Sequence, residues 1–266
     1  MIPNILSIAG SDPSGGAGIQ ADIKAISANG GYAMAVITGL TAQNTRGVQA
    51  VEMVSPEMIA AQIAAIRADI EIHAIKIGML GDARTIEAVA EALEGVDAPI
   101  VLDPVMVAKG GDRLLAEDAV TALRERLLRR AAVITPNLPE AADLLQDAEC
   151  QTLAEMRGQA ARLLSLGCGA VLIKGGHLPD ADATDLLLTP EVETQLMAPR
   201  TETRNTHGTG CTLSSALATQ LGRGHALPEA TRRAKAYISG AIAAADDLQV
   251  GAGHGPVHHF YLQRKR

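Results

Sequence analysis

Short apolar runs alternate along the chain with longer segments in which apolar and polar residues recur at helical spacing. The apolar runs are nearly continuous, which is typical of strands in a parallel sheet covered on both faces. This alternation predicts a single three-layer α/β domain over residues 1–266, with a central, mostly parallel sheet and helices on both faces. The predicted strands are Ile5–Ala9, Ala33–Leu40, Ile72–Ile77, Ile100–Leu102, Ala132–Ile134 and Ala170–Ile173, with a hairpin or edge extension at Ala183–Thr189 and Val192–Met197.

Capping residues mark the starts of several helices between these strands. Ser55 and Pro56 predict a helix over Pro56–Ile70, and Asp82 caps another that runs to about Leu93. The last two predicted helices carry small residues on most faces, so we expect both to be largely buried. The remaining predicted helices are Glu117–Leu128, Thr152–Leu166, Thr209–Leu221 and Pro228–Leu248.

Composition narrows the classes of protein that this chain can belong to. It has 266 residues, 47% of them hydrophobic, and a net charge of −7, which weighs against a protein that coats nucleic acid. Aromatic residues make up only 2%, so base-stacking platforms are nearly excluded and the core must be aliphatic. No basic residue precedes Lys24, no continuous apolar span is present, and three scattered cysteines suit a reducing compartment. We therefore expect a cytoplasmic protein without membrane or nucleic-acid partners.

A Gly-rich turn over residues 9–18 (AGSDPSGGAG) separates the first strand from a helix. It is neither a G-x-x-x-x-G-K-[ST] loop nor a G-x-G-x-x-G fingerprint. Four glycines are more than a strand-to-helix turn needs, which favours a ligand site at the carboxyl edge of a parallel strand. Asp22, four residues past Gly18, could point back into that site, or it could only stabilise the helix N-terminus.

A second Gly-rich segment, Asn205–Thr212 (NTHGTGCT), opens a helix rich in Leu and Ala. Small residues at a helix start leave backbone N–H groups exposed and aimed at one point, which makes an anion hole. Cys211 falls in the first turn, where the helix dipole lowers the pKa of a thiol, so it could accept a proton from an alcohol. The alternative is a buried structural cysteine in a tightly packed helix start.

Polar residues follow three of the predicted strands. Asp103 follows one, Asn137 and Glu140 follow the next, and Lys174 follows a third. Together with an anion hole they predict phosphoryl transfer, in which the lysine holds phosphates and the carboxylates hold Mg²⁺, directly or through water. Each residue alone also fits a structural role, as a helix cap or a solvated charge.

A zinc site is not expected, although five histidines invite the question. The cysteines are scattered, and three of these histidines fall in Gly251–Phe260, a segment that we expect to be irregular. The five histidines are His177, His207, His254, His258 and His259.

These motifs together resemble the ribokinase-like superfamily, and within it the hydroxymethylpyrimidine/phosphomethylpyrimidine kinases of thiamine biosynthesis. The matching segments span nearly the whole chain, and the first and seventh of them are quite specific. They are AGSDPSGGAGIQADIK (9–24), TAQNTRGV (41–48), KIGML (76–80), VLDPVM (101–106), TPNLPEA (135–141), KGGHL (174–178), NTHGTGCT (205–212) and GPVHHF (255–260).

The resemblance implies an ATP- and Mg²⁺-dependent kinase that forms a homodimer. The amides of Gly208, Thr209 and Gly210 would form the anion hole for the transferred phosphoryl group. Cys211 stands where the wider superfamily has an aspartate base. The resemblance therefore implies that these residues are catalytic.

At the nucleotide end, Asn137 and Glu140 match the N-x-x-E element that the superfamily links to Mg²⁺ and its waters. With the strand-end analysis above, this predicts ATP contacts from Lys174, Asn137 and Asp103, and metal contacts from Glu140 and Asp103, with Asp103 acting directly or through water.

At the acceptor end, Gln43 matches the glutamine that contacts the pyrimidine. Its primary amide offers one donor and one acceptor side by side, which complements an amino group beside a ring nitrogen. With few aromatics available, soft apolar side chains such as Met79 and Val105 must pack against the ring. Gly10 and Asp22 complete the predicted acceptor contacts.

Two other functions remain open from the sequence. A pyridoxal kinase of the same fold would not need Gln43, because pyridoxal lacks the amino–ring-nitrogen edge. A non-catalytic pyrimidine sensor could keep the pocket without Cys211, Lys174 and Glu140, so their presence favours an enzyme.

Overall fold

Eight strands form the central sheet of the computed structural model, which describes residues 1–106, 114–116, 119–176, 178 and 182–263. Their order is β10-β9-β8-β7-β6-β5-β1-β2; β8 to β2 run parallel, and β9 and β10 add an antiparallel hairpin at the β8 edge. The predicted α/β class is thereby confirmed. The strands are β1 (Asn4–Ala9), β2 (Tyr32–Ile37), β5 (Ala74–Ile77), β6 (Ile100–Leu102), β7 (Val133–Ile134), β8 (Val171–Ile173), β9 (Asp185–Leu188) and β10 (Glu193–Leu196).

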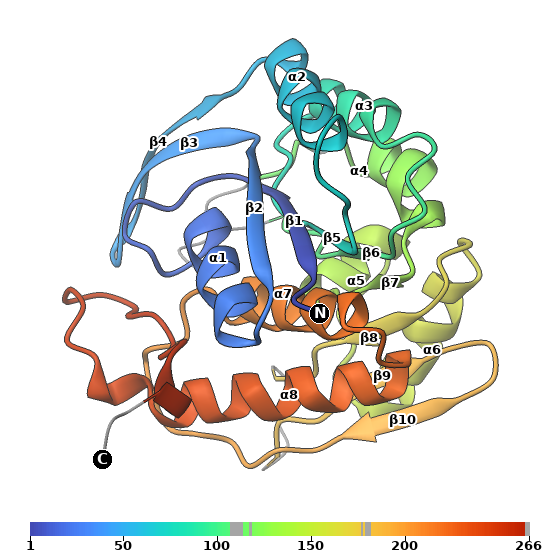
Figure 1. Cartoon of the computed structure of the whole chain (residues 1–266). Coiled ribbons are helices and arrows are strands. Elements are labelled where there is room, and N and C mark those ends of the chain that lie inside the picture. The colour runs from blue at the N-terminus through green and yellow to red at the C-terminus, as the bar shows by residue number, and fades with distance from the viewer. Residues whose placement is uncertain (107–113, 117–118, 177, 179–181, 264–266) are drawn as a thin grey trace.

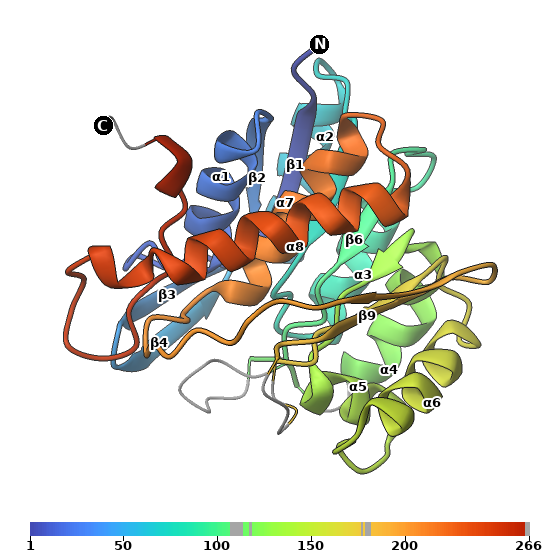
Figure 2. The ribbon, with the colours of Figure 1, turned by 90° about the horizontal axis from the view of Figure 1, so that it is seen from below.

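Helices cover both faces of this sheet (Figures 1 and 2). One hydrophobic cluster joins one face to α2, α3, α4, α5 and α6, and a second joins the other face to α1, α7 and α8. Both clusters are almost entirely aliphatic, as the composition requires. The helices are α1 (Gly18–Ala28), α2 (Pro56–Arg67), α3 (Ala83–Ala92), α4 (Ala119–Ala122), α5 (Leu138–Leu145), α6 (Leu153–Leu164), α7 (Thr209–Gly222) and α8 (Leu227–Ala243).

The two C-terminal helices differ in burial, although both were expected to be largely buried. α7 is buried almost throughout, because it lies between the sheet and α8. α8 forms the outer layer, so Arg232, Arg233 and Ala236 are exposed while Ala234 and Ile238 pack inward. The expectation for α8 was therefore wrong: small residues allow close packing, but its position in the outer layer exposes one face.

A separate two-stranded hairpin, β3 (Gly39–Asn44) and β4 (Gly47–Met53), stands beyond the end of β2. The single strand predicted over Ala33–Leu40 is therefore two elements. Thr38 breaks the run: its hydroxyl donates to the Met79 carbonyl at 2.6 Å, and its amide pairs with the last residue of β1. With β1 ending at Ala9, the chain has no sheet neighbour to follow and turns away at Gly39.

Element boundaries otherwise agree with the predictions to within a few residues. The helix predicted near Glu117–Leu128 is described only from Ala119, where one α-helical turn leads into a wider π-helical turn, Leu123–Leu127; Glu117 lies outside the described residues. His177 also lies outside them. No helix in the described part of the chain is long and apolar enough to cross a membrane.

Candidate active site

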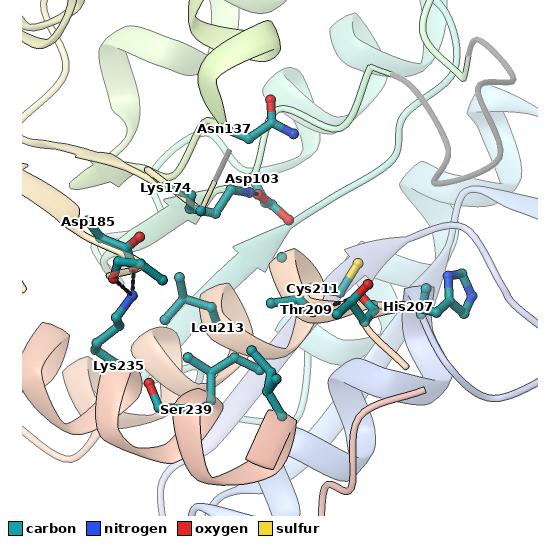
Figure 3. A pocket seen from close by; sticks show the side chains of 18 of the residues that line it. Asp103, Asn137, Lys174, Asp185, His207, Thr209, Cys211, Leu213, Lys235 and Ser239 are labelled. Carbon is teal, nitrogen blue, oxygen red and sulfur yellow. Dashed lines mark hydrogen bonds and ion pairs between the residues drawn. The ribbon is translucent and has the colours of Figure 1, made fainter. Parts of the chain in front are cut away.

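A cavity of about 350 Å³ lies where the carboxyl ends of β6, β7 and β8 meet the N-terminus of α7. A smaller cavity of about 50 Å³ adjoins it and shares Gln43, Val105, Leu114 and Cys211 with it. The large cavity extends to α8, so in Figure 3 Cys211 and His207 lie at one side and Lys235 at the other. The four polar residues that follow strands in the sequence, Asp103, Asn137, Glu140 and Lys174, all line it.

The start of α7 is shaped by Gly208, which has a φ of +74°. A Cβ there would lie 1.8 Å from the Gly16 carbonyl oxygen, so only glycine lets the two Gly-rich segments approach so closely. Among the described residues no acceptor bonds the amides of Gly208 and Gly210, whereas the Thr209 amide makes a long 3.4 Å bond to the Thr206 carbonyl. Two of the three predicted anion-hole amides are thus free to meet a ligand.

Asp12 fixes the first Gly-rich segment against the second. Its Oδ1 accepts from the amide of Ser14 at 2.9 Å, and its Oδ2 accepts from the amides of Gly16 at 3.1 Å and Ala17 at 2.7 Å. The same Oδ2 lies 2.8 Å from His207 Nε2. His207 therefore holds two loops together, a role that sequence reasoning missed.

The Cys211 thiol opens onto both cavities from the first turn of α7. The sequence predicted a lowered pKa at this helix start. Instead, burial raises the pKa of Cys211 to about 11, with Lys76 acting in the opposite direction. That expectation was wrong because a helix terminus lowers a thiol pKa only when solvation or a strong countercharge also favours the thiolate.

Asp22 lies behind the site rather than in it. Its Oδ2 accepts from Ser7 Oγ at 2.7 Å and from Lys76 Nζ at 2.8 Å, and its Oδ1 accepts from Ser215 Oγ at 2.8 Å. The side chain is completely buried and lines neither cavity. The prediction that it points into the site is therefore wrong, because three donors from other elements hold both of its oxygens.

Lys174 forms the centre of a charged cluster that also contains Asp103 and Glu140. Its Nζ lies 2.8 Å from Asp103 Oδ1 and 3.6 Å from Glu140 Oε2. Figure 3 shows Lys174 directly beside Asp103, with Asn137 above them. Asn137 and Glu140 form a capping box on α5: the Asn137 side chain accepts from the Glu140 amide, and Glu140 Oε2 accepts from the Asn137 amide, each at 2.8 Å.

The pKa values of the two carboxyl groups of this cluster are shifted in opposite directions. Burial, with Asp103 nearby, raises the pKa of Glu140 to about 7 against the opposing charge of Lys174. Burial would also raise the pKa of Asp103, but Lys174 and Lys76 outweigh it and hold that pKa below its usual range. Glu140 therefore exchanges a proton near neutral pH, while Asp103 stays ionised.

The donor set suits Mg²⁺ held together with a nucleotide. The described residues contain no group of three or more His, Cys, Asp or Glu that could hold a metal ion by themselves. Glu140 keeps its Oε1 free of any described partner, whereas Thr135 and Lys174 occupy Asp103 Oδ1. One available carboxylate beside a phosphate site is what Mg²⁺ uses when it keeps several waters, so the residues fit the ion.

The small cavity contains the other predicted acceptor contacts. Gly10, Met79 and Val105 line it together with Gln43 from the β3–β4 hairpin. A Cβ on Gly10 would lie 2.5 Å from the Met79 terminal methyl, so glycine leaves room for Met79 in its present position. Leu114 also lines both cavities, and the sequence offered no signal for it.

Two buried lysines were missed although the sequence carried a signal for each. Lys76 interrupts an otherwise apolar strand, and Lys235 shares a helix face with Ile238 and Ile242. Lys235 lines the far end of the large cavity and pairs with Asp185 at 2.7 Å. A charged residue inside a strongly apolar pattern is rare without a partner, so such positions indicate a buried ion pair.

Comparison with known proteins identifies the family. The family described as "Phosphomethylpyrimidine kinase" matches residues 12–258. The hydroxymethylpyrimidine/phosphomethylpyrimidine kinases of Escherichia coli (strain K12) and Rhizobium meliloti (strain 1021) are 53% and 54% identical to this chain, covering 97% and 96% of both sequences.

Solved structures agree with this assignment. An ADP complex of Bacillus subtilis pyridoxal kinase is 36% identical with a TM-score of 0.92 and covers 100% of both chains. A phosphomethylpyrimidine kinase from Clostridium difficile 630 is 40% identical with a TM-score of 0.79, covering 89% of this chain and 98% of that one. The chain thus belongs to the phosphomethylpyrimidine kinase family.

Proposed function

We infer that this protein is an ATP-dependent kinase that phosphorylates 4-amino-5-hydroxymethyl-2-methylpyrimidine and then its monophosphate to the diphosphate, in thiamine biosynthesis. The observation that carries this conclusion is that the two cavities adjoin. A small apolar cavity beside Gln43 shares Cys211 with the large cavity, which the start of α7 and Lys174 also line. An acceptor and a triphosphate can therefore meet at Cys211, as phosphoryl transfer requires.

The nucleotide end binds ATP through fixed positive groups. Lys174 and the Gly208 and Gly210 amides meet the phosphates, while Asn137 lines the cavity beside them. Related structures support a nucleotide at this fold: the Staphylococcus aureus pyridoxal kinase has been solved with AMP-PCP. Glu140 and Asp103, which both lie beside Lys174, would hold Mg²⁺, directly or through water, and the ion would neutralise charge on the phosphates.

The acceptor end recognises the edge of a flat, polar ring. Among the described residues the Gln43 side chain makes only long contacts, 3.4 Å to Thr41 Oγ1 and 3.4 Å to His207 Nε2, so its amide is available to a ligand. Met79 and Val105 pack against the ring face. Both steps use the same phosphoryl site, with the monophosphate shifted so that its phosphate becomes the acceptor.

Changing Gln43 to Ala tests this recognition. Losing a buried hydrogen-bonding pair costs about 1–3 kcal/mol, so KM for the pyrimidine alcohol should rise roughly 5- to 150-fold while KM for ATP changes little. Gln49→Ala is the matched control, because Gln49 is an exposed residue of β4 in the same hairpin. An unchanged pyrimidine KM in Gln43→Ala would remove Gln43 from the site.

Pyridoxal is the second candidate acceptor, favoured by the high structural similarity to pyridoxal kinases. A coupled ATP assay with the pyrimidine alcohol and pyridoxal under equal conditions separates the two. We expect a higher kcat/KM for the pyrimidine alcohol, and that preference should shrink in Gln43→Ala. Preference for pyridoxal in the unmodified protein would contradict the assignment.

A further inference from the structure

Lys76 is a lysine in the middle of a parallel sheet. Its side chain is completely buried on β5, where neighbouring positions hold Ile75 and Ile77. Burying an ammonium group is costly unless charge and hydrogen bonding compensate it. Position 78 is a glycine, and a Cβ there would lie 2.6 Å from Lys76 Nζ, so the backbone leaves room for this charge. The buried ammonium therefore requires a functional explanation.

The ammonium is only partly satisfied within the protein. It can donate three hydrogen bonds, yet in the described part of the chain its single acceptor is Asp22 Oδ2 at 2.8 Å. Asp22 is itself fixed by Ser7 and Ser215, so it acts as a rigid anchor. Lys76 also lines the small cavity, as Cys211 does. The Lys76 ammonium thus lies at the same cavity wall as the thiol, with N–H donors that have no acceptor among the described residues.

We propose that Lys76 is a positioning residue that supplies the countercharge for the Cys211 thiolate, and that the first phosphorylation depends on this charge far more than the second. The proposal rests on the inferred two-step activity. It goes beyond that activity in naming a buried cation, which lines the small cavity and not the large one, that distinguishes the two steps.

The two acceptors differ in whether a proton must be removed. In the first step the hydroxymethyl O–H bond breaks, and its proton passes to the Cys211 sulfur as the O–P bond forms. The bond between the γ-phosphorus and its bridging oxygen breaks, and that electron pair leaves with ADP. In the second step the acceptor is a phosphate whose second pKa is about 6, so it is already ionised at neutral pH. Only the alcohol needs a base.

Four charged groups act electrostatically on Cys211 and together decide whether a thiolate can form. Lys76 from β5 and Lys174 after β8 are cations, while Asp22 from α1 and Asp103 after β6 are anions. Burial raises the thiol pKa to about 11, and Lys76 is the leading influence that lowers it. Removing the Lys76 charge should therefore disfavour the thiolate, and removing the Asp22 charge should favour it.

The first experiment compares the two acceptors in Lys76→Met, which removes the cation and keeps an unbranched side chain of similar length. At saturating MgATP, kcat/KM for the alcohol should fall by roughly 10²–10⁴-fold, the scale of a lost general base, and kcat/KM for the monophosphate should fall much less. Equal losses with both acceptors, or no loss with either, would overturn the proposal. Failure of the unmodified protein to phosphorylate either acceptor would instead overturn the inferred activity.

Lys235→Met is the matched control for this comparison. Lys235 is also a buried lysine paired with an aspartate, but it lies at the far end of the large cavity. Its loss should change both steps by a common factor, because both use the same nucleotide. A selective loss of the alcohol reaction in Lys235→Met would show that any buried charge has this effect, and would overturn the assignment to Lys76.

The second experiment measures the alkylation rate of Cys211 directly and does not depend on catalysis. In a Cys150→Ser/Cys168→Ser background, iodoacetamide should alkylate Cys211 more slowly when Lys76→Met is added and faster when Asp22→Asn is added. Merely structural damage would expose the thiol and accelerate both. Opposite directions support the proposal, and changes in the same direction would contradict it, whether or not the inferred activity is correct.

Discussion

Two helices of this protein, α5 and α6, begin with the same local structure. Each carries a capping box in which a polar N-cap side chain accepts from the third helical amide and a glutamate returns a bond to the N-cap amide. In α5 the pair is Asn137 and Glu140, and in α6 it is Thr152 and Glu155. Within its own helix, each glutamate accepts a hydrogen bond from the N-cap amide.

Their surroundings make the two glutamates chemically different. Glu140 is buried 3.6 Å from Lys174, and burial raises its pKa to about 7. Glu155 is exposed, and the backbone N–H of Gln151 is the leading cause that lowers its pKa. A local motif therefore positions a carboxylate, while the tertiary neighbours decide whether it serves only as a cap or also as part of a site.

The largest effect should follow from removing Lys174, the cation that distinguishes the α5 box. In Lys174→Met, Asp103 and Glu140 lose their cation and the phosphates lose a donor, so kcat/KM for ATP should fall roughly 10²–10³-fold. Arg157→Met is the control, because Arg157 pairs with Glu193 on the exposed surface of α6 and should leave activity unchanged. Near-normal activity in Lys174→Met would show that the cluster is structural.

A smaller effect should separate the two glutamates themselves. Glu140→Gln should weaken the apparent affinity for Mg²⁺ by about 10- to 100-fold, the usual cost of removing an outer partner of a metal, with little change in metal-free nucleotide binding. Glu155→Gln removes the same charge from the other box and should leave the Mg²⁺ titration unchanged. Identical Mg²⁺ titrations for both variants would show that Glu140 serves only as a helix cap.

The two glutamates should also give stability opposite dependences on pH. Between about pH 4.5 and 7 the folded protein holds a proton on Glu140 that the unfolded chain releases, so this group makes stability fall as pH rises. The lowered pKa of Glu155 has the opposite effect on stability. The stability that this group contributes is lost as the pH falls through its pKa, which lies below the usual value for glutamate. Thermal unfolding of metal- and nucleotide-free protein should show a shallower fall between about pH 5 and 7 in Glu140→Gln. A fall of unchanged steepness would contradict the shift.

The smallest effect should come from the α6 box alone. Thr152→Ala removes the side-chain acceptor for the Glu155 amide, which costs about 1 kcal/mol of stability, or about 2–4 °C in Tm for a domain near this size. Both kinase activities should be unaffected, because α6 contributes no polar side chain to the cavity. A loss of activity larger than the loss of stability would mean that the α6 box supports the site after all.

Local chemistry allowed much of the fold to be predicted. Ser55 and Asp82 cap α2 and α3 as expected, since a cap depends only on residues within one turn. The apolar runs predict the parallel strands because each is buried on both faces. Asp103 and Lys174 were identified for a similar reason: strand ends at one edge of a parallel sheet must meet.

The predictions that were wrong concern features that depend on contacts between distant segments. Asp22 was expected to face the ligand, but it bonds Ser215, which is 193 residues away, and Lys76, which is 54 residues away. The Cys211 pKa was expected to fall, but burial under neighbouring elements raises it. The β3–β4 hairpin was hidden because an apolar run continues across Thr38, where the sheet partner ends.

The sequence by itself determined most of the strand and helix pattern and four of the polar residues that gather at the site, Asp103, Asn137, Glu140 and Lys174. These follow from backbone propensity, hydrophobic period and the geometry of parallel sheets. Only the tertiary structure decided which carboxylate is titratable near neutral pH, which aspartate is an anchor and which lysine lines the same small cavity as the thiol. Those properties depend on burial and on charges within a few ångströms, and both are set by segments far apart in the chain.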